Sequence, residues 1–232
     1  MALADIQAAK LSQLATELSD SGVTVYHEVV DISDDTAVQA FCAAAARALG
    51  SLNQLVNTVG SVDNMGDVAE LSPEEWERAL RTNLTSAFLV GHHAVPLLIE
   101  AGGGSIVNIS SVSGMANQAR MMAYSVTKAA MLALTRSEAI DLAQYGIRAN
   151  SVCPGSVETK LVEHAIDLMA VKTDRSPAET RRDWESQYPT GRFTQPREVA
   201  DLVLFLCSSQ ASNITGSSFV IDGGLTALLP ER

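Results

Sequence analysis

The sequence predicts an α/β fold, in which helices cover both faces of a mainly parallel β-sheet. Segments with the apolar period of a helix alternate along the chain with short runs of β-branched residues. Strands that are joined through helices run parallel, because each crossover connection is right-handed. The 232 residues contain no repeat, linker or low-complexity tract, so one domain over residues 1–232 is expected.

In the first half of the chain the expected elements follow one another at short intervals. They are a helix over 6–19, a strand over 23–31, a helix over 33–50, a strand over 52–60 and a long helix over 72–102. Ser33 is the expected N-cap of the second helix, and Gly50 is expected to end it. Ser72 is expected to cap the long helix, and Pro96 should kink it.

The second half continues the alternation after one polar interruption. Its expected elements are a strand over 102–111, a helix over 123–146, a strand over 147–155, a helix over 196–209 and a strand over 217–224. Residues 157–190 are polar and irregularly patterned, which favours a mobile lid over the substrate. Met169, Trp184 and Tyr188 could line an apolar pocket there, and simple packing is an equal alternative for Trp184.

Composition narrows the classes of partner and compartment. The net charge of −11 argues against nucleic acid or an anionic membrane surface as a partner. The apolar runs are too short to span a membrane, and the first ten residues lack the pattern of a signal peptide. The three cysteines are odd in number and widely spaced, which predicts no disulfide framework and no metal site and favours the reducing cytoplasm.

One pair of side chains raises a question of chemistry. Tyr124 and Lys128 are four positions apart in the expected helix, so they share one face. A surface lysine lying over a tyrosine ring is the ordinary explanation of such a pair. However, Ser110 and Ser111 directly follow the preceding strand, at the carboxyl edge where open α/β sheets bind ligands. The surroundings therefore favour a functional pair.

Several motifs together resemble the short-chain dehydrogenase/reductase family, of the single-domain kind with a Tyr-x-x-x-Lys pair. The likeness runs from Met1 to about Gly224. Its motifs are NTVG (57–60), the asparagine of RTNLTS, a serine thirteen positions before the tyrosine, YSVTK (124–128), PGSVET (154–159), GRFTQPREVA and FVIDGG. Thr58 and Val59 depart from the usual Asn-Asn-Ala-Gly, whereas Asn57 and Gly60 match it.

The resemblance implies a catalytic set and a role for each member. A free phenol has a pKa near 10, which is too high for a good base at neutral pH. In the family, the equivalent of Tyr124 is the acid/base, and that of Lys128 lowers its pKa and binds the nicotinamide ribose. Ser111, with Ser113 as a weaker candidate, would bind the substrate oxygen, and Asn83 would hold a water in a proton relay. The plainer alternatives are that Ser111 caps a strand end and that Asn83 satisfies helix backbone.

The resemblance also implies a dinucleotide cofactor and the residues that hold it. Asp5 matches the acidic residue that binds the adenosine ribose hydroxyls, so NAD is favoured over NADP. Asp5 could also serve as the N-cap of the helix that begins at Ile6, and Asp31, whose family equivalent touches adenine, could simply cap a helix. The remaining cofactor-binding candidates are Asn57, Gly60, Tyr124, Lys128, Pro154, Gly155, Val157 and Thr159.

The chain departs from the family at its beginning. No G-x-G-x-x-G segment occurs, and MALAD resembles the tail of the family's second strand. The expected fold is therefore Rossmann-like and doubly wound but without its first strand, glycine-rich turn and helix, roughly 30 residues. Such a sheet loses a central strand, exposes an apolar edge, and binds the pyrophosphate of a dinucleotide poorly.

Three classes of function follow, of which an enzyme is favoured. The chain is expected to be a cytoplasmic oxidoreductase that transfers a hydride between NAD(H) and a small alcohol or ketone. The alternative is a non-catalytic, truncated remnant that keeps the fold. In either case the resemblance implies a homodimer or homotetramer through helices 78–99 and 121–144. A regulator that only binds nucleotide would not need Ser111, Tyr124 and Lys128 together.

Overall fold

The computed structural model describes residues 1–62 and 65–228, and its strands form two separate sheets. The smaller sheet pairs β1 (Ala2–Asp5) with β2 (Tyr26–Val29). The larger sheet has the order β3 (Gln54–Asn57), β4 (Gly104–Ile109), β5 (Ile147–Pro154) and β6 (Ser218–Ile221). Every pairing between these strands is parallel, which confirms the expected α/β class.

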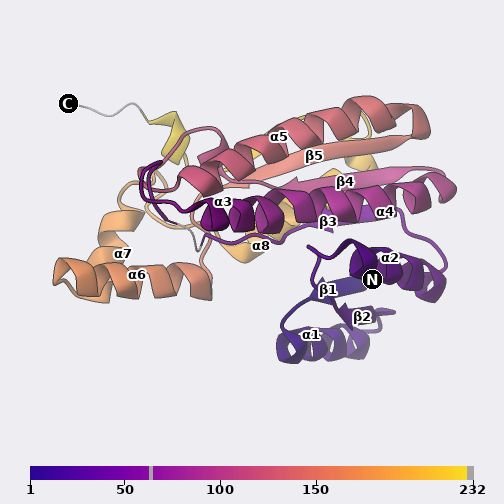
Figure 1. The fold of residues 1–232 in the computed structure, drawn as a ribbon, viewed down its shortest axis with the longest axis horizontal. Helices are drawn as coiled ribbons and strands as arrows, with labels where there is room; N and C mark the ends of the chain where they lie inside the picture. Colours follow the sequence, from indigo (N-terminus) through magenta and orange to yellow (C-terminus); the bar gives the residue numbers. More distant parts are fainter. Residues whose placement is uncertain (63–64, 229–232) are drawn as a thin grey trace.

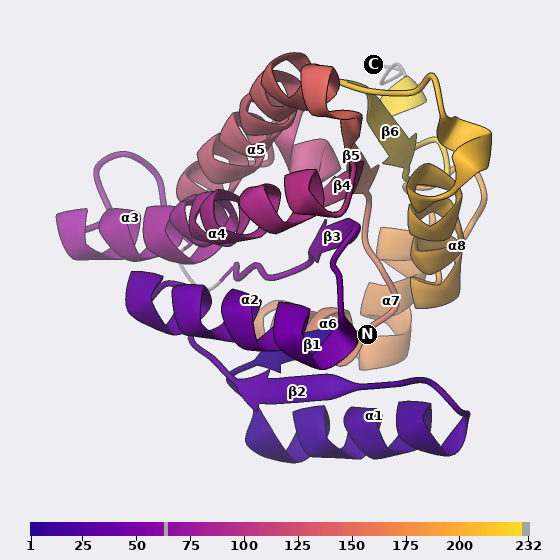
Figure 2. The same cartoon turned by 90° about the vertical axis from the view of Figure 1, so that its right-hand side faces the viewer.

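The division between the sheets lies between β1 and β3. Among the described residues β1 pairs only with β2, and β3 pairs only with β4, so one edge of each of these two strands has no strand beside it. Figure 2 shows the small β1–β2 sheet standing apart from the larger sheet, with α2 (Asp35–Leu49) beside both. Val56 of β3 is accordingly 39% exposed, which is high for an apolar residue in a parallel strand. β1 and β3 therefore share no ladder of backbone hydrogen bonds in the described part of the chain.

Helices cover both faces of each sheet (Figure 1, Figure 2). α1 (Ala8–Asp20) and α2 lie on opposite faces of the β1–β2 pair. α4 (Ser86–Glu100) and α5 (Met122–Leu142) cover one face of the larger sheet, and α8 (Pro196–Cys207) covers the other. None of the described helices is long and apolar enough to cross a membrane.

Two apolar cores result from the alternation of side chains along β4. Ile106 belongs to the core beneath α2, α4 and α5, with Val38, Leu98 and Ala149. The next residue, Val107, points to the opposite face and packs against Leu206 of α8. Both residues are fully buried, as expected for a central strand of a parallel sheet.

The first two helices begin later than their sequence patterns predict. α1 begins at Ala8, and the Asp5 carboxylate accepts a hydrogen bond from the Gln7 amide at 2.7 Å, so Asp5 is not its N-cap. Asp34 caps α2 by accepting from the Ala37 amide at 3.0 Å, and the expected N-cap, Ser33, lies one residue too early. Gly50 ends α2 with a φ of 80°, as expected.

The expected long helix is continuous but changes its winding in the middle. α3 (Pro73–Leu80) begins with a capping box between Ser72 and Glu75, which confirms Ser72 as the cap. A π-helical turn over Arg81–Thr85 then leads into α4. α4 continues through Pro96, so the irregular winding lies at the π turn and not at the proline.

The polar segment 157–190 is not irregular, as its pattern suggested, but forms two helices. α6 (Lys160–Thr173) is followed by α7 (Pro177–Glu185), which has a capping box between Ser176 and Glu179. Their polarity reflects exposure, because the pair packs beside the sheets and not between them (Figure 1). Tyr188 and Trp184 pack into a small core with Ile166 and Phe193, which favours packing for Trp184. The mobility of this segment stays a prediction.

Candidate active site

The first turns of α5 place Tyr124 and Lys128 together, as their spacing predicts. The Lys128 ammonium lies 5.7 Å from the centre of the Tyr124 ring. It donates a hydrogen bond to the main-chain oxygen of Ile109, the last residue of β4, at 2.9 Å. Lys128 is only 3% exposed, so it is not a surface lysine resting on a ring.

The end of β4 is tied to the same turn of α5. The Ser110 hydroxyl donates to the main-chain oxygen of Lys128 at 2.8 Å. The Ser111 hydroxyl accepts from the Ser113 amide at 3.1 Å and also lies within hydrogen-bonding reach of the Tyr124 phenol. Ser111 therefore caps a local turn and faces the phenol at the same time, so the two explanations of this serine are compatible.

Close backbone contact keeps this turn against α5. After Ser111 a short 3-10 turn runs over Val112–Gly114. A Cβ at Gly114 would lie 2.7 Å from the main-chain carbon of Lys128, which is closer than real Cβ atoms approach. Only glycine therefore allows the serine-bearing turn to approach the helix that carries Tyr124.

Asn83 is held at the centre of the π turn by contacts with a distant segment. Its side-chain amide donates to the Ser61 main-chain oxygen at 2.9 Å, and its side-chain oxygen accepts from the Ser61 amide at 2.7 Å. It also donates to the Thr127 hydroxyl at 3.3 Å. Asn83 is 1% exposed, and its side chain satisfies the backbone of Ser61 and not that of its own helix.

The acid–base balance of the pair departs from the sequence-based expectation. Burial raises the pKa of Tyr124 above its ordinary value, and the hydrogen bond with Ser111 opposes this. Burial also lowers the pKa of Lys128 to about 8, opposed by nearby Cys153. The expected lowering of the Tyr124 pKa by Lys128 is thus absent here, because the ammonium is directed to Ile109 and both groups are buried.

A cavity of about 490 Å³ opens at the carboxyl ends of β1, β2 and β3. Its walls include Asp5, Asp31 and the segment Thr58–Ser61 that follows β3. Hydrogen bonds from Ser33 lower the pKa of Asp31, so this side chain is an anion at neutral pH. The structure therefore brings together four of the cofactor-binding candidates, since Asn57 directly precedes the Thr58–Ser61 wall and Gly60 lies within it.

Gly60 connects this cavity to the catalytic candidates. A Cβ added to it would lie 3.2 Å from the Lys128 Nζ and 3.6 Å from the Asn83 side-chain oxygen. The strand-end segment thus packs directly on both side chains. The cavity and the Ser111–Tyr124–Lys128 group consequently belong to one continuous edge of the molecule.

The cavity fits one half of a dinucleotide. Two carboxylates at the ends of β1 and β2 suit the hydroxyls of a ribose and the amine of an adenine as hydrogen-bond acceptors. A pyrophosphate needs backbone amides at a helix N-terminus. Of the described helices, α1 and α2 both begin beside the cavity. α2 begins with Asp34 and Asp35, which repel an anion, whereas α1, whose N-cap Gln7 lines the cavity, has no acidic residue in its first turn. The residues present thus fit the nucleoside half of a dinucleotide.

The segment after β5 lies at the same edge of the sheet, beside the end of β4. Pro154 ends β5, and the Gly155 amide donates to the Ile221 oxygen of β6 at 3.1 Å. Val157 bridges to Thr194, and Thr159 is the exposed N-cap of α6. Gly155 thus contacts β6, and Val157 contacts the stretch before α8. The structure therefore brings the four cofactor-binding candidates to the same edge of the sheet as Lys128, without a hydrogen bond between any of them and Lys128.

The structure gives contacts at the site to three side chains outside the predicted catalytic set, of which only Ser110 was noted in the sequence. Ser110 joins β4 to α5, Ser61 holds Asn83, and Thr127 accepts from Asn83 while donating to the Tyr124 main-chain oxygen at 2.7 Å. Thr127 lies three positions after Tyr124, so the helical period could have placed it on this face. Ser61 carries no such signal, because its partner is 22 positions away.

Comparisons with known proteins agree on the kind of molecule. A family model described as enoyl-(acyl carrier protein) reductase matches residues 1–226. The cis-4-hydroxycyclohexanecarboxylate dehydrogenase of Sinomonas cyclohexanicum is 36% identical over 215 residues, which are 93% of this chain and 82% of that protein.

Two solved structures have the same fold over nearly the whole chain. An NAD⁺-bound xylitol dehydrogenase is 28% identical, with a TM-score of 0.90 over 96% of this chain and 88% of that one. The L-sorbose reductase of Gluconobacter frateurii, complexed with NADPH and L-sorbose, is 26% identical, with a TM-score of 0.93 over 98% of this chain and 87% of that one. The first is a dehydrogenase of the alcohol xylitol, and the second is a reductase of the ketose L-sorbose.

Proposed function

Given that the chain belongs to the short-chain dehydrogenase/reductase family and is an oxidoreductase, we propose that it transfers a hydride between NAD(H) and a CH–OH or C=O carbon of a small substrate. The observation that carries the proposal is the meeting of Ser111, Tyr124 and Lys128 at one sheet edge. A non-catalytic remnant or a nucleotide-binding regulator has no need of this buried polar group.

The residues act on the proton that accompanies the hydride. When bound, the nicotinamide supplies or accepts the hydride. During oxidation the Tyr124 oxygen accepts the proton of the substrate hydroxyl, and during reduction it returns a proton to the carbonyl oxygen. Ser111 donates a hydrogen bond to that substrate oxygen as its charge develops. Lys128, with a pKa of about 8, is mostly protonated at neutral pH, and we assign its ammonium to bind the nicotinamide ribose and, when it turns from Ile109 toward Tyr124, to stabilise the phenolate. We assign Asn83, fixed on Ser61, to hold the relay water.

The proposal is tested with the purified chain and a panel of secondary alcohols. The panel contains hydroxycyclohexanecarboxylate and xylitol, which the names of similar proteins suggest, together with acyclic alcohols of the same size. We expect NAD⁺ reduction with at least one alcohol, and its loss in the Ser111→Ala variant. NAD⁺ reduction that is equal in the Ser111→Ala and wild-type proteins would contradict the proposed site.

NAD is proposed as the preferred cofactor because Asp5 lines the nucleoside cavity. Its carboxylate is held by the Gln7 amide at 2.7 Å and would repel a 2′-phosphate. We expect Asp5→Ser to shift the ratio of kcat/KM for NADH over NADPH toward NADPH by about tenfold, or ~1.4 kcal/mol. Asp31→Asn is the matched control and should lower kcat/KM for NADH and for NADPH by the same factor. A wild-type preference for NADPH would overturn the assignment.

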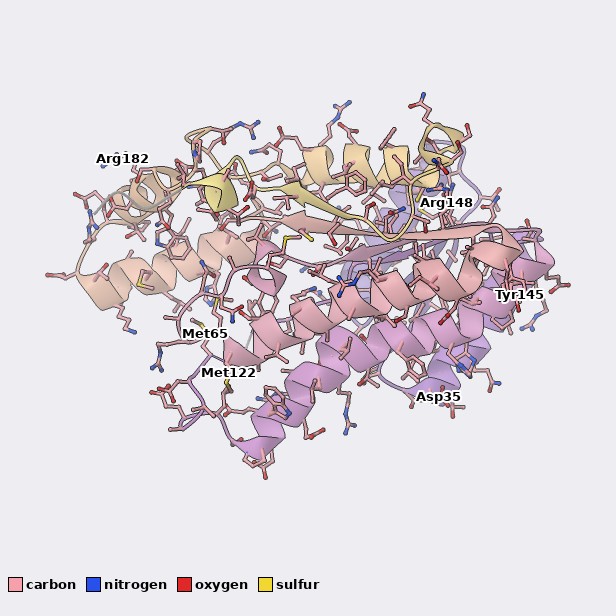
Figure 3. The ribbon with its side chains drawn as sticks, turned by 90° about the horizontal axis from the view of Figure 1, so that it is seen from above. Asp35, Met65, Met122, Tyr145, Arg148 and Arg182 are labelled. Carbon is pink, nitrogen blue, oxygen red and sulfur yellow. The ribbon has the colours of Figure 1, made fainter. Side chains whose placement is uncertain are left out.

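We propose that the protein assembles as a homodimer or homotetramer through helices 78–99 and 121–144. Figure 3 shows α5, between the labelled Met122 and Tyr145, lying beside α4. Each helix exposes a stripe at intervals of three or four residues. On α5 the stripe is Val126, Ala129, Ala133, Ser137 and Ile140. Along the π turn and α4 it is Thr85, Phe88, His92, Pro96 and Ile99. Phe88 is 53% and Ile140 77% exposed, which favours a partner surface.

The assembly is tested by placing a charge at the centre of the α5 stripe. Ala133→Arg is expected to leave the fold intact and to convert the wild-type oligomer to a smaller species, because an arginine cannot be buried there unpaired. Light scattering after size exclusion measures the mass. Ala9→Arg, on the exposed face of α1, is the matched control. An unchanged mass for Ala133→Arg would exclude this interface.

We propose that residues 1–232 form one domain, in which residues 157–190 cover the substrate. Glu158 ties the base of the segment, because its carboxylate accepts from Arg181 of α7 at 2.9 Å and from Gln195 at 2.6 Å. We also place the protein in the cytoplasm, since its three cysteines are free thiols and two of them are buried.

A further inference from the structure

A buried row of polar side chains links the edge strand β3 to α5. The Asn57 amide donates to the Asn108 side-chain oxygen at 2.8 Å. The Asn108 amide in turn donates to the Thr135 hydroxyl at 2.9 Å and to the Glu138 carboxylate at 2.8 Å. Asn108 is fully buried, and neither it nor Glu138 belongs to the catalytic set.

The two acceptors on α5 set the direction of the whole row. The Thr135 hydroxyl donates to the Met131 main-chain oxygen at 2.9 Å, so toward Asn108 it acts as an acceptor. Both amide hydrogens of Asn108 are then used on α5, and its oxygen must face Asn57. Without the Glu138 acceptor, the Asn108 amide is free to turn over and to present hydrogens to the Asn57 amide, which also carries hydrogens.

The position of β3 matters because this strand has little else to hold it. It has four residues and, within the described chain, pairs only with β4. Directly after Asn57 comes Thr58–Ser61, which lines the nucleoside cavity, packs on Lys128 and holds Asn83. A shift of the Asn57 end therefore moves the wall that connects the cavity to the catalytic group.

We propose that Glu138 is a positioning residue, which fixes the Asn57 end of β3 through Asn108 and thereby the Thr58–Ser61 wall of the cavity. The inference rests on the proposed function only in naming the cavity a cofactor site. The carboxylate also lies against α4, since a Cβ added at Gly91 would be in ordinary van der Waals contact with the second Glu138 oxygen, at 3.4 Å. Burial raises the pKa of Glu138 to about 7, so the acceptor is held at an energetic cost.

The first test compares amide hydrogen exchange in three variants of the full chain. Glu138→Leu removes the acceptor and replaces it with an apolar side chain of similar size, whereas Glu138→Gln keeps a carbonyl oxygen that can accept the hydrogen bond. Asp141→Asn, an exposed carboxylate three positions further on α5, is the matched control. We expect exchange in residues 54–61 to become about tenfold faster in Glu138→Leu. Exchange in residues 147–154 should be unchanged, and the other two variants should resemble wild type.

The same variants are then compared for the KM of NADH and for kcat. We expect Glu138→Leu to raise the KM of NADH about fivefold while kcat stays within twofold of wild type. In Glu138→Gln the KM of NADH should be close to the wild-type value. Exchange that stays at the wild-type rate in Glu138→Leu, or rises equally in 54–61 and 147–154, overturns the positioning role. So does a Glu138→Gln variant that behaves like Glu138→Leu. A chain without turnover refutes the proposed function alone, because the exchange result stands by itself.

Discussion

Tyr124→Phe is expected to lower the rate of hydride transfer by about 10³-fold, with cofactor affinity within twofold of wild type. Phenylalanine keeps the ring that packs beside Lys128 and removes only the oxygen that exchanges a proton with the substrate. Tyr124 lies on the first turn of α5 and does not line the cavity that holds Asp5 and Asp31, so we expect the contacts of the nucleotide there to be unchanged.

Single-turnover kinetics with prebound NADH separates the chemical step from binding, and fluorescence titration of NADH gives the affinity. Ser111→Ala serves as a companion, since it keeps the phenol and removes the hydrogen bond to the substrate oxygen. Residual hydride transfer in Tyr124→Phe at a tenth of the wild-type rate would reject the phenol as the acid/base.

Lys128→Met is expected to abolish turnover and, at pH 7, to raise the free energy of unfolding by about 1–3 kcal/mol. Burial lowers the pKa of Lys128 from 10.5 to about 8, so the folded protein holds an ammonium that its interior disfavours. Each unit of difference between the two pKa values corresponds to ~1.4 kcal/mol, so the buried ammonium lowers the free energy of unfolding by ~3 kcal/mol. The lost hydrogen bond to Ile109 offsets about 1 kcal/mol of the gain.

The sign of this effect depends on pH. Below pH 8 Lys128 is protonated in both states, and the full cost is present in the folded protein. Between about pH 8 and 10.5 the folded side chain loses its proton first, so the wild-type protein recovers stability as the pH rises. Urea unfolding at pH 7 and pH 9 should therefore show a smaller advantage for Lys128→Met at the higher pH. Lys10→Met, at an exposed site on α1, is the control, and a destabilised Lys128→Met at pH 7 would refute the account.

The sequence predicts the elements whose signals are local. Gly50 ends α2 and Ser72 caps α3 because each acts on the backbone within one helical turn of itself. The shared face of Tyr124 and Lys128 follows in the same way from the helical period. The five strands from β2 to β6 were equally predictable along the chain, because parallel strands buried on both faces require continuous apolar runs such as that of β4, whereas β1 was not among the expected elements.

What the sequence could not predict depends on partners far along the chain. The π turn at Arg81–Thr85 coincides with the Asn83–Ser61 clamp, a contact across 22 positions. The hydrogen bond of the Lys128 ammonium to Ile109 depends on how β4 meets α5, and so does the burial that raises the pKa of Tyr124. The helices α6 and α7 were missed for another reason, because an exposed helix pair buries too little to show an apolar period.

The separation of the two sheets divides the fold into two units that share one apolar core. No backbone hydrogen bond of a shared ladder joins β1–β2 to the larger sheet in the described chain. The contacts between the two parts include the apolar core of Val30, Val38, Cys42, Ala94 and Leu98, and the pair of His93 on α4 with Asp35 on α2 at 2.7 Å. Such a unit can undock at a lower free energy than global unfolding. Asp5 and Asp31 belong to the smaller unit, whereas Tyr124 and Lys128 belong to the larger one. A ligand that binds both units at once therefore stabilises the docked arrangement, and its apparent affinity is lower by the free energy needed to keep the units docked.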